Sequence, residues 1–211
     1  MTLASRLAGL MLTLPFAGTA VAETGTSTGT TLPVSAVARL DFTVTIGRLL
    51  FFRVGDAAWP ATSSSVSTAS FQLTPTTPPA TALANNQPIA WNGAAPTFAV
   101  TASGNVLPVQ VRSNAGPISI RASSSALSHT TTAGLTIPMS DILVTSSDAA
   151  GLPAPPIPNA AATGTSVNVA PTGFGSLVTE RNASWTFAYA NSAARAAGTY
   201  TGTVTFTATT P

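Results

Sequence analysis

The side chains that most often carry out enzymatic chemistry are scarce in this chain and far apart in its sequence. It contains no cysteine and no lysine, one histidine, and six aspartates and glutamates. The histidine, His129, lies in a polar stretch with no nearby carboxylate that would orient it as a general base. The sequence therefore predicts no catalytic residue, and we expect the protein not to be an enzyme.

Two short motifs with a chemical meaning are also weak. Residues 25–29 (Gly-Thr-Ser-Thr-Gly) have the spacing of a hydrolase nucleophile elbow, but no strand and helix pattern surrounds Ser27. Asp141 and Asp148 flank a predicted strand, whereas calcium needs several oxygens at loop spacing and zinc needs several Cys or His ligands. We expect neither a metal site nor a cofactor.

The charge pattern argues against a nucleic-acid partner. Every basic residue is an arginine, and the formal net charge is only +2 at pH 7. These arginines are scattered, whereas nucleic-acid binding needs clustered cations against the phosphates. With no cysteine, the fold must depend on burial and strand pairing without disulfides.

Residues 1–22 have the three parts of a cleavable signal peptide. Arg6 precedes an apolar stretch at residues 7–17, and small residues end the segment at Ala22. The apolar stretch is shorter than the about 20 residues that span a bilayer as a helix. We expect cleavage after Ala22, secretion to the periplasm or the bacterial cell surface, and no membrane span after cleavage.

The elements that remain are predicted to be strands. The closing residues place Tyr200, Val204 and Phe206 on one parity and threonines on the other, which indicates a strand with one buried face. Similar patterns, separated by Gly and Pro turns, predict strands at residues 34–46 (one long strand or two), 49–54, 66–73, 97–102, 106–112, 117–122, 141–145, 166–169, 184–189 and 199–208.

These strands predict an all-β fold: a single immunoglobulin-like antiparallel β-sandwich of about ten strands over residues 34–211. A flexible Thr- and Gly-rich leader is expected at residues 23–33. Proline clusters at residues 75–79 and 153–158 are expected in surface connections, since proline donates no ladder hydrogen bond. Trp185 and Phe187 are expected to face Tyr200 and Phe206 in an aromatic hairpin.

The C-terminal run Gly198-Thr199-Tyr200-Thr201-Gly202-Thr203-Val204 resembles the closing strand of secreted bacterial pilin-like domains. It is most similar to spore coat protein U and the related chaperone–usher pilins, which end in a similar Gly-x-Tyr-Thr-x-Thr-Val motif. The resemblance implies a sandwich that lacks one strand and is completed by an extension from a neighbouring subunit. It also implies a periplasmic chaperone and other subunits of the same fibre as partners.

The mature N-terminus offers a candidate donor strand in Val34, Ala36 and Ala38, which share one parity after the leader. The same residues also fit the first strand of the domain itself. The favoured function is thus an exported structural or adhesive surface subunit, fimbrial in its leading version and acting in cell adhesion.

The alternative is a self-contained extracellular or periplasmic binding module for carbohydrate or peptide. Its ligand would be held by loops at residues 75–92 and 148–165, with Trp59 and Trp91 as stacking platforms.

Overall fold

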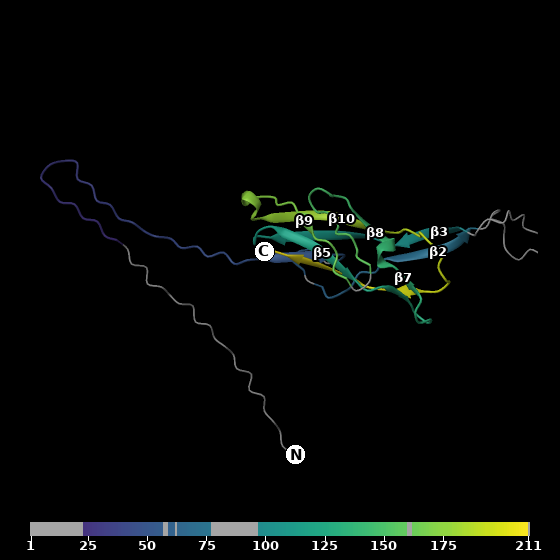
Figure 1. The fold of residues 1–211 in the computed structure, drawn as a ribbon. Coiled ribbons are helices and arrows are strands. Elements are labelled where there is room, and N and C mark those ends of the chain that lie inside the picture. The colour runs from purple at the N-terminus through teal and green to yellow at the C-terminus, as the bar shows by residue number, and fades with distance from the viewer. Residues whose placement is uncertain (1–22, 57–58, 62, 77–96, 160–161, 211) are drawn as a thin grey trace, which may run out of the picture. The chain divides into compact units, whose positions relative to one another are not determined.

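The computed structural model describes residues 23–56, 59–61, 63–76, 97–159 and 162–210. The chain divides into two units, Met1–Ile46 and Gly47–Pro211. All strands lie in the second unit, while residues 23–46 of the first contain no strand (Figure 1). The β-structure therefore begins at Leu50, later than the expected start at Val34.

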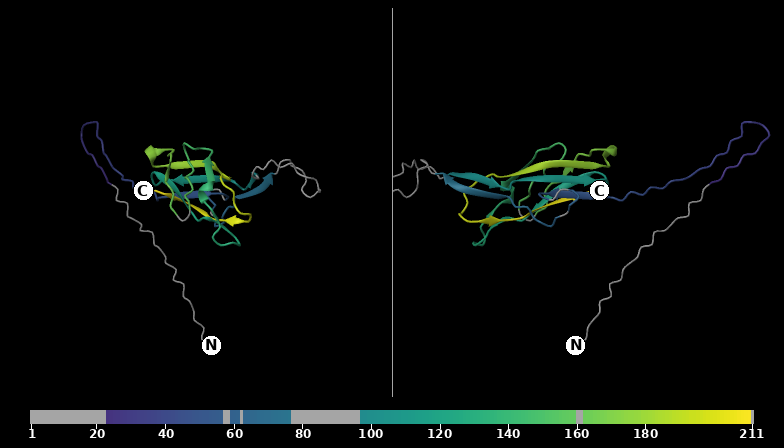
Figure 2. Two further views of the ribbon diagram at one scale, coloured as in Figure 1. Left: turned by 45° about the vertical axis from the view of Figure 1, so that its right-hand side comes forward. Right: turned by 180° about the vertical axis from the view of Figure 1, so that it is seen from behind.

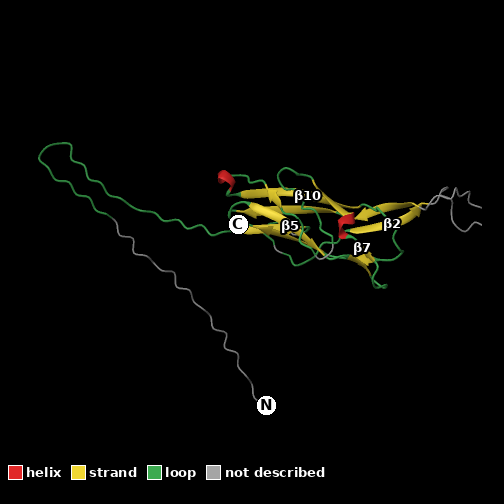
Figure 3. Ribbon diagram, viewed as in Figure 1, coloured by secondary structure: helices red, strands yellow, loops and turns green. Residues whose placement is uncertain are grey.

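The second unit is all β, and every pairing between its strands is antiparallel. Its two helices are single 3-10 turns, Met139–Asp141 and Phe174–Ser176 (Figure 3). No described residue belongs to a helix long and apolar enough to cross a membrane. The strands in the described part are β1 (Leu50–Val54), β2 (Ser70–Thr76), β3 (Thr97–Ser103), β4 (Val106–Ser113), β5 (Ile118–Ser124), β6 (Leu127–His129), β7 (Thr136–Ile137), β8 (Ile142–Ser146), β9 (Val167–Val169), β10 (Thr179–Tyr189), β11 (Tyr200–Thr201) and β12 (Val204–Thr209).

Two sheets form the sandwich. The first has the strand order β1-β4-β10-β8 and the second has the order β12-β5-β9. Figure 2 shows these two layers from further directions. Alternation explains the packing, since the inward parity of β4 and β5 carries apolar residues that are almost fully buried, such as Val111 and Ile120, both 0% exposed. The predicted antiparallel β-sandwich is confirmed, with twelve strands among the described residues instead of about ten.

Two smaller sheets extend this framework. β11, β6 and β7 form a three-stranded sheet, and β2 pairs with β3 in a separate ribbon (Figure 1). The ribbon has one apolar face, where Leu73 pairs with Val100, and one hydroxyl-rich face, where Gln72 pairs with Thr101. β6 and β7 are only three and two residues long, and the sequence pattern did not predict them.

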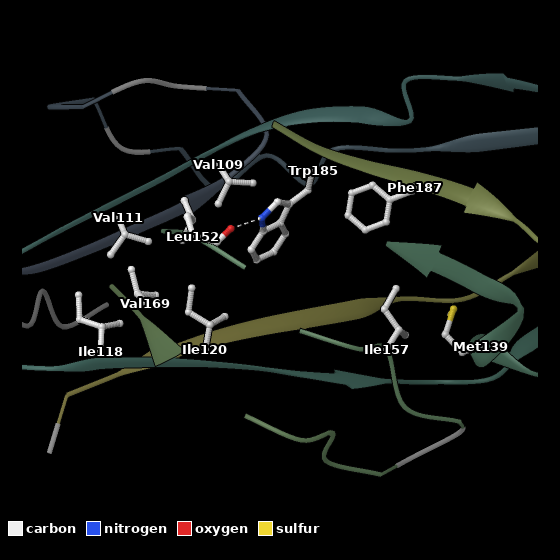
Figure 4. Close-up of a cluster of buried hydrophobic side chains, with 10 residues drawn as sticks. All are labelled: Val109, Val111, Ile118, Ile120, Met139, Leu152, Ile157, Val169, Trp185 and Phe187. Atoms are coloured by element: carbon white, nitrogen blue, oxygen red, sulfur yellow. Dashed lines mark hydrogen bonds between the residues drawn. The ribbon is translucent and has the colours of Figure 1, made fainter. Parts of the chain in front are cut away.

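Trp185 lies at the centre of the core and is 0% exposed. Its indole Nε1 donates a hydrogen bond to the Leu152 carbonyl oxygen at 3.4 Å, as Figure 4 shows. Its ring lies 6.4 Å from that of Phe52 on β1 and 5.1 Å from that of Phe206 on β12. The buried members of the core are Val109, Val111, Ile118, Ile120, Met139, Leu152, Ile157, Val169, Trp185 and Phe187.

The predicted aromatic hairpin is wrong, although its aromatic contact is present. β10 pairs with β4 and β8 in one sheet, whereas β12 pairs with β5 in the other. Trp185 therefore meets Phe206 across the sandwich and not along a shared hairpin. The short link that would have joined a hairpin instead contains β11, which pairs with β6.

Candidate functional site

One side of the sandwich, between β8 and β9, is closed by the chain's own loop. In the described part of this loop, Leu152 is 0% exposed, Ile157 is 7% exposed and Pro155 is fully buried. The loop also pairs beside β5, because the Gly164 amide donates to the Ala122 carbonyl at 2.7 Å. The prolines at 153–158 were predicted to mark a surface connection. Pro156 is exposed as expected, whereas Pro155 is fully buried.

Polar contacts hold this loop in place. The Ser146 hydroxyl donates to the Leu152 carbonyl at 2.6 Å, and the Ser124 hydroxyl donates to the Pro158 carbonyl at 2.6 Å. Arg181 donates from Nε to the Ala170 carbonyl at 2.9 Å, and its Nη1 lies 3.9 Å from Asp148 Oδ2. The closed side is therefore built from buried apolar side chains whose backbone groups are satisfied.

The opposite side, between β1 and β12, has no such cover among the described residues of the second unit. β1 pairs only with β4 and β12 pairs only with β5, so each strand is the edge of its sheet. β1 and β12 are neighbours, but no hydrogen bond joins them in the described structure. Each edge consequently presents backbone N–H and C=O groups that a further strand could pair with.

Side-chain burial is lower at the edges of the two sheets than at their centre. On the central strands, Val109, Val111, Ile118, Ile120 and Trp185 are 0–1% exposed. The inward apolar residues of the edge strands are only partly buried, on the closed side (Ile142, Val144 and Val167) as on the open side (Phe52, Val54, Val204, Phe206 and Ala208). The open side therefore has both unpaired backbone and apolar side chains that are incompletely covered.

An exposed apolar row lies in the first unit. Phe42, Val44 and Ile46 are 83%, 81% and 78% exposed, and Leu40, on the same parity, is 56% exposed. Arg39, Asp41, Thr43 and Thr45 take the other parity. The predicted strand at residues 34–46 is thus absent from this unit, although the alternation that suggested it is real.

The predicted donor residues belong to the start of this row. Val34 is 47% exposed, and Ala36 and Ala38 are also exposed. The same parity continues without a break through four residues that were not predicted as donors: Leu40, Phe42, Val44 and Ile46. Their larger side chains can bury more apolar surface than two alanines.

The two predicted stacking tryptophans have different outcomes. Trp91 lies outside the described residues, as does most of the loop at residues 75–92. Trp59 is 40% exposed and packs edge-on against Phe51, with the ring centroids 5.0 Å apart. Its amide donates to Gln110 Oε1 at 3.1 Å, which holds it over the outer face of the first sheet. In the second predicted ligand loop, at residues 148–165, Gly151, Leu152, Pro155 and Ile157 are buried, whereas Ala149, Ala150 and Pro156 are exposed.

The remaining chemical candidates have structural partners. His129 ends β6, where its Nδ1 accepts from the Thr132 amide at 2.9 Å and its Nε2 lies 3.2 Å from the Ala197 carbonyl oxygen. A Cβ at Gly198 would collide with this imidazole, so the ring lies against the turn at Gly198. His129 is thus half-buried at a strand end, and both of its ring nitrogens have backbone partners.

The two aspartates considered for calcium are both occupied by arginine. Asp141 Oδ2 lies 2.9 Å from Arg195 Nη2, and this hydrogen bond raises the pKa of Arg195 above its ordinary value. Asp148 pairs with Arg181 and accepts from the Gly151 amide at 2.8 Å. Within the ranges that the structure describes, no three His, Asp or Glu side chains gather as a metal site would require.

A shallow hollow of about 280 Å³ lies along β5 and the start of β12. It has no charged side chain, and the Ser124 hydroxyl in it already donates to Pro158. This hollow therefore offers little beyond hydroxyl groups for a ligand. Its lining residues are Ser123, Ser124, Ser125, Ala162, Thr163, Thr203 and Thr205.

The open side of the sandwich and the apolar row of residues 40–46 are thus both apolar and incompletely buried. Comparison with known proteins does not assign them: no family model matches the chain, and neither does a curated protein or a solved structure.

Proposed function

We propose that the protein is an exported structural or adhesive surface subunit whose copies join into a fimbria-like fibre by strand addition. The observation that carries this proposal is the exposed row of Leu40, Phe42, Val44 and Ile46. Alternating apolar residues with no covering sheet are typical of a strand whose partner lies on another molecule. The same parity begins at the predicted donors Val34, Ala36 and Ala38. The larger side chains at positions 40, 42, 44 and 46 form the second half of the proposed donor strand.

The size of the apolar side chains supports donation. Full burial of a Val, Leu, Ile or Phe side chain contributes about 1.5–3 kcal/mol relative to exposure. Four such residues on one parity offset part of the entropy cost of ordering the segment on a partner. Thr43 and Thr45, on the other parity, would then face water, as Thr205 and Thr207 do on β12.

The acceptor is the open side of a second copy. Backbone pairing along β12 or β1 would satisfy the free edge, and the apolar row would cover Phe206, Val204 and Phe52. Both requirements have a period of two, so one register meets them together. On the closed side, the loop after β8 already packs against the core with Leu152 and Ile157, so a donated strand is not expected to bind there.

An open apolar side also bears on how the subunit is handled before assembly. A fibre subunit with an open apolar side needs protection before assembly, which supports a periplasmic chaperone as a partner. The resemblance of the closing strand to those of chaperone–usher pilins points the same way.

The test is the mass of the exported chain in solution, measured by sedimentation velocity. The unmodified chain should form multimers, and Phe42→Asp with Val44→Asp should leave only monomer, because a charge cannot enter the apolar interior. The matched control is Thr43→Asp with Thr45→Asp, which alters the other parity and should retain the multimers. An unmodified chain that remains monomeric at every concentration, with or without a coexpressed chaperone, contradicts the proposal.

A further inference from the structure

A second unassigned feature lies on the outer face of the first sheet. The outward residues of β1 and β4 face each other in register, with Phe51 opposite Arg112 and Arg53 opposite Gln110. β10 continues the grid, with Glu180 opposite Arg112 and Asn182 opposite Gln110. We name Phe51, Arg53, Trp59, Arg112 and Asn182 the arginine–tryptophan patch.

The cations of this patch are incompletely satisfied. The Nε atoms of Arg53 and Arg112 are both buried and have no hydrogen-bond partner among the described residues. Arg112 pairs through Nη1 with Glu180 at 3.0 Å, whereas Arg53 has no ion pair among the described residues. Of the two guanidinium groups in the patch, only that of Arg112 has a carboxylate partner among the described residues. A buried donor without a partner costs free energy, so the two orphaned Nε atoms require an explanation.

An aromatic platform adjoins these cations. Trp59 packs edge-on against Phe51 and is fixed through its amide by Gln110. Trp59 as a whole is 40% exposed, so part of its surface is open to a ligand. Asn182 is exposed on the next strand but one and offers both a donor and an acceptor.

We propose that the arginine–tryptophan patch binds acidic sugar units of a glycan. A guanidinium binds a carboxylate through paired charge-assisted hydrogen bonds, and Arg53 has no ion pair among the described residues that would compete for it. An aromatic ring packs against the C–H face of a sugar, and a side-chain amide pairs with its hydroxyls. Phosphate-rich polymers fit less well, because they need several adjacent cations, and this patch has one arginine without a carboxylate partner.

The site does not depend on strand donation. The patch lies on the outward parity of β1 and β4, whereas the open side exposes the inward parity, including Phe52 and Val54. A chain that fails to assemble can therefore still bind the sugar, and the two proposals fail separately.

The experiment is a titration of the full chain with sodium glucuronate, followed by the NMR signal of the Trp59 indole N–H. Saturable shifts are expected, with much smaller ones from glucose, which has a similar ring without the carboxylate. Arg53→Gln should weaken binding about tenfold or more, since a charge-assisted contact is lost. Arg53→Lys should recover only part of it, because lysine lacks the planar fork.

The matched control is Arg121→Gln, an exposed arginine on β5 with no ion pair among the described residues. It should leave the affinity unchanged. Unchanged Trp185 indole signals establish that each variant is folded. The proposal is overturned if neither glucuronate nor N-acetylneuraminate saturates the site. It is also overturned if Arg53→Gln and the control Arg121→Gln lose affinity equally. Acetate or a peptide carboxylate binding as tightly as glucuronate would also overturn it.

Discussion

The two sides of the sandwich differ in how the apolar core between the sheets is covered. Between β8 and β9, the loop after β8 inserts Leu152, Pro155 and Ile157 between the sheets and pairs with β5. Between β1 and β12, no described segment of the second unit does so, and Phe52 and Phe206 remain partly exposed. In its first unit, the same chain carries an apolar row at residues 40–46 whose side chains are exposed.

A core that is left open on one side, as between β1 and β12, can serve to bind another molecule. A short loop adjacent in sequence closes one side within the fold, at a modest entropy cost. A segment left outside the fold can close the other side only by binding, so that burial drives assembly instead of folding. Substitutions at the core, on the closed side and in the apolar row should lower the free energy of unfolding of the monomer by decreasing amounts.

The largest effect is expected at the centre, which both sides share. Trp185→Ala should lower the free energy of unfolding by about 3–5 kcal/mol, because it removes a fully buried indole and the Leu152 hydrogen bond. Urea denaturation followed by circular dichroism measures this loss. A midpoint that does not change would place Trp185 outside the core.

A substitution on the closed side comes next. Leu152→Ala should cost about 2–5 kcal/mol, since the loop residue is 0% exposed and its cavity cannot collapse freely. Leu143→Ala is the control, because Leu143 is 53% exposed on the neighbouring strand and should cost little. Thermal melts of the two variants compare them directly. Equal losses would show that the loop does not close this side.

A smaller loss is expected from the polar attachment of the same loop. Arg181→Gln removes the hydrogen bond from Nε to Ala170 and should cost about 1–3 kcal/mol. Hydrogen exchange should rise in residues 151–170 before it rises in β4. Arg121→Gln, on an exposed strand position, serves as the comparison; exchange that rises uniformly in Arg181→Gln would argue against a local role.

The smallest effect on the monomer is expected in the apolar row, despite the size of its side chains. Phe42→Asp should change the free energy of unfolding by no more than about 0.5 kcal/mol, because an 83% exposed phenylalanine contributes little to the fold. Urea denaturation of dilute protein measures this. A loss comparable to that of Leu152→Ala would mean that residues 34–46 belong to the domain's own core, as a first strand would.

The sequence predicted the local structure well where alternation determined it. The parity of Val204, Phe206 and Ala208 on the last strand is the observed one, and Trp185 is buried as expected. Most strands begin and end within a few residues of their predicted bounds. β6 and β7 were missed because strands of two or three residues contain too little alternation to stand out.

What alternation does not encode is the partner of a strand. Residues 34–46 have a pattern as clear as that of β12, yet they form no strand in the first unit. The aromatic pattern likewise predicted that β10 and β12 meet, but not that they meet across the sandwich. Pro155 was assigned to the surface because proline is excluded from central strands, a rule that does not prevent it from filling a core.

The candidate patch around Arg53 could be predicted only in part. Trp59 was identified from its position beside turn residues, but its neighbours on the outer face come from three strands whose register no local pattern fixes. The orphaned Nε atoms of Arg53 and Arg112 are likewise a property of the folded sheet.

The central claim is tested most directly by adding a peptide of residues 34–46 to the chain that lacks residues 23–46. Ligand that binds only the folded state raises the melting temperature in a concentration-dependent way, and the peptide should do so here. A peptide with serine at positions 40, 42, 44 and 46 should have no effect. If the shortened chain ignores both peptides while the full chain still forms multimers, strand donation by this segment is wrong.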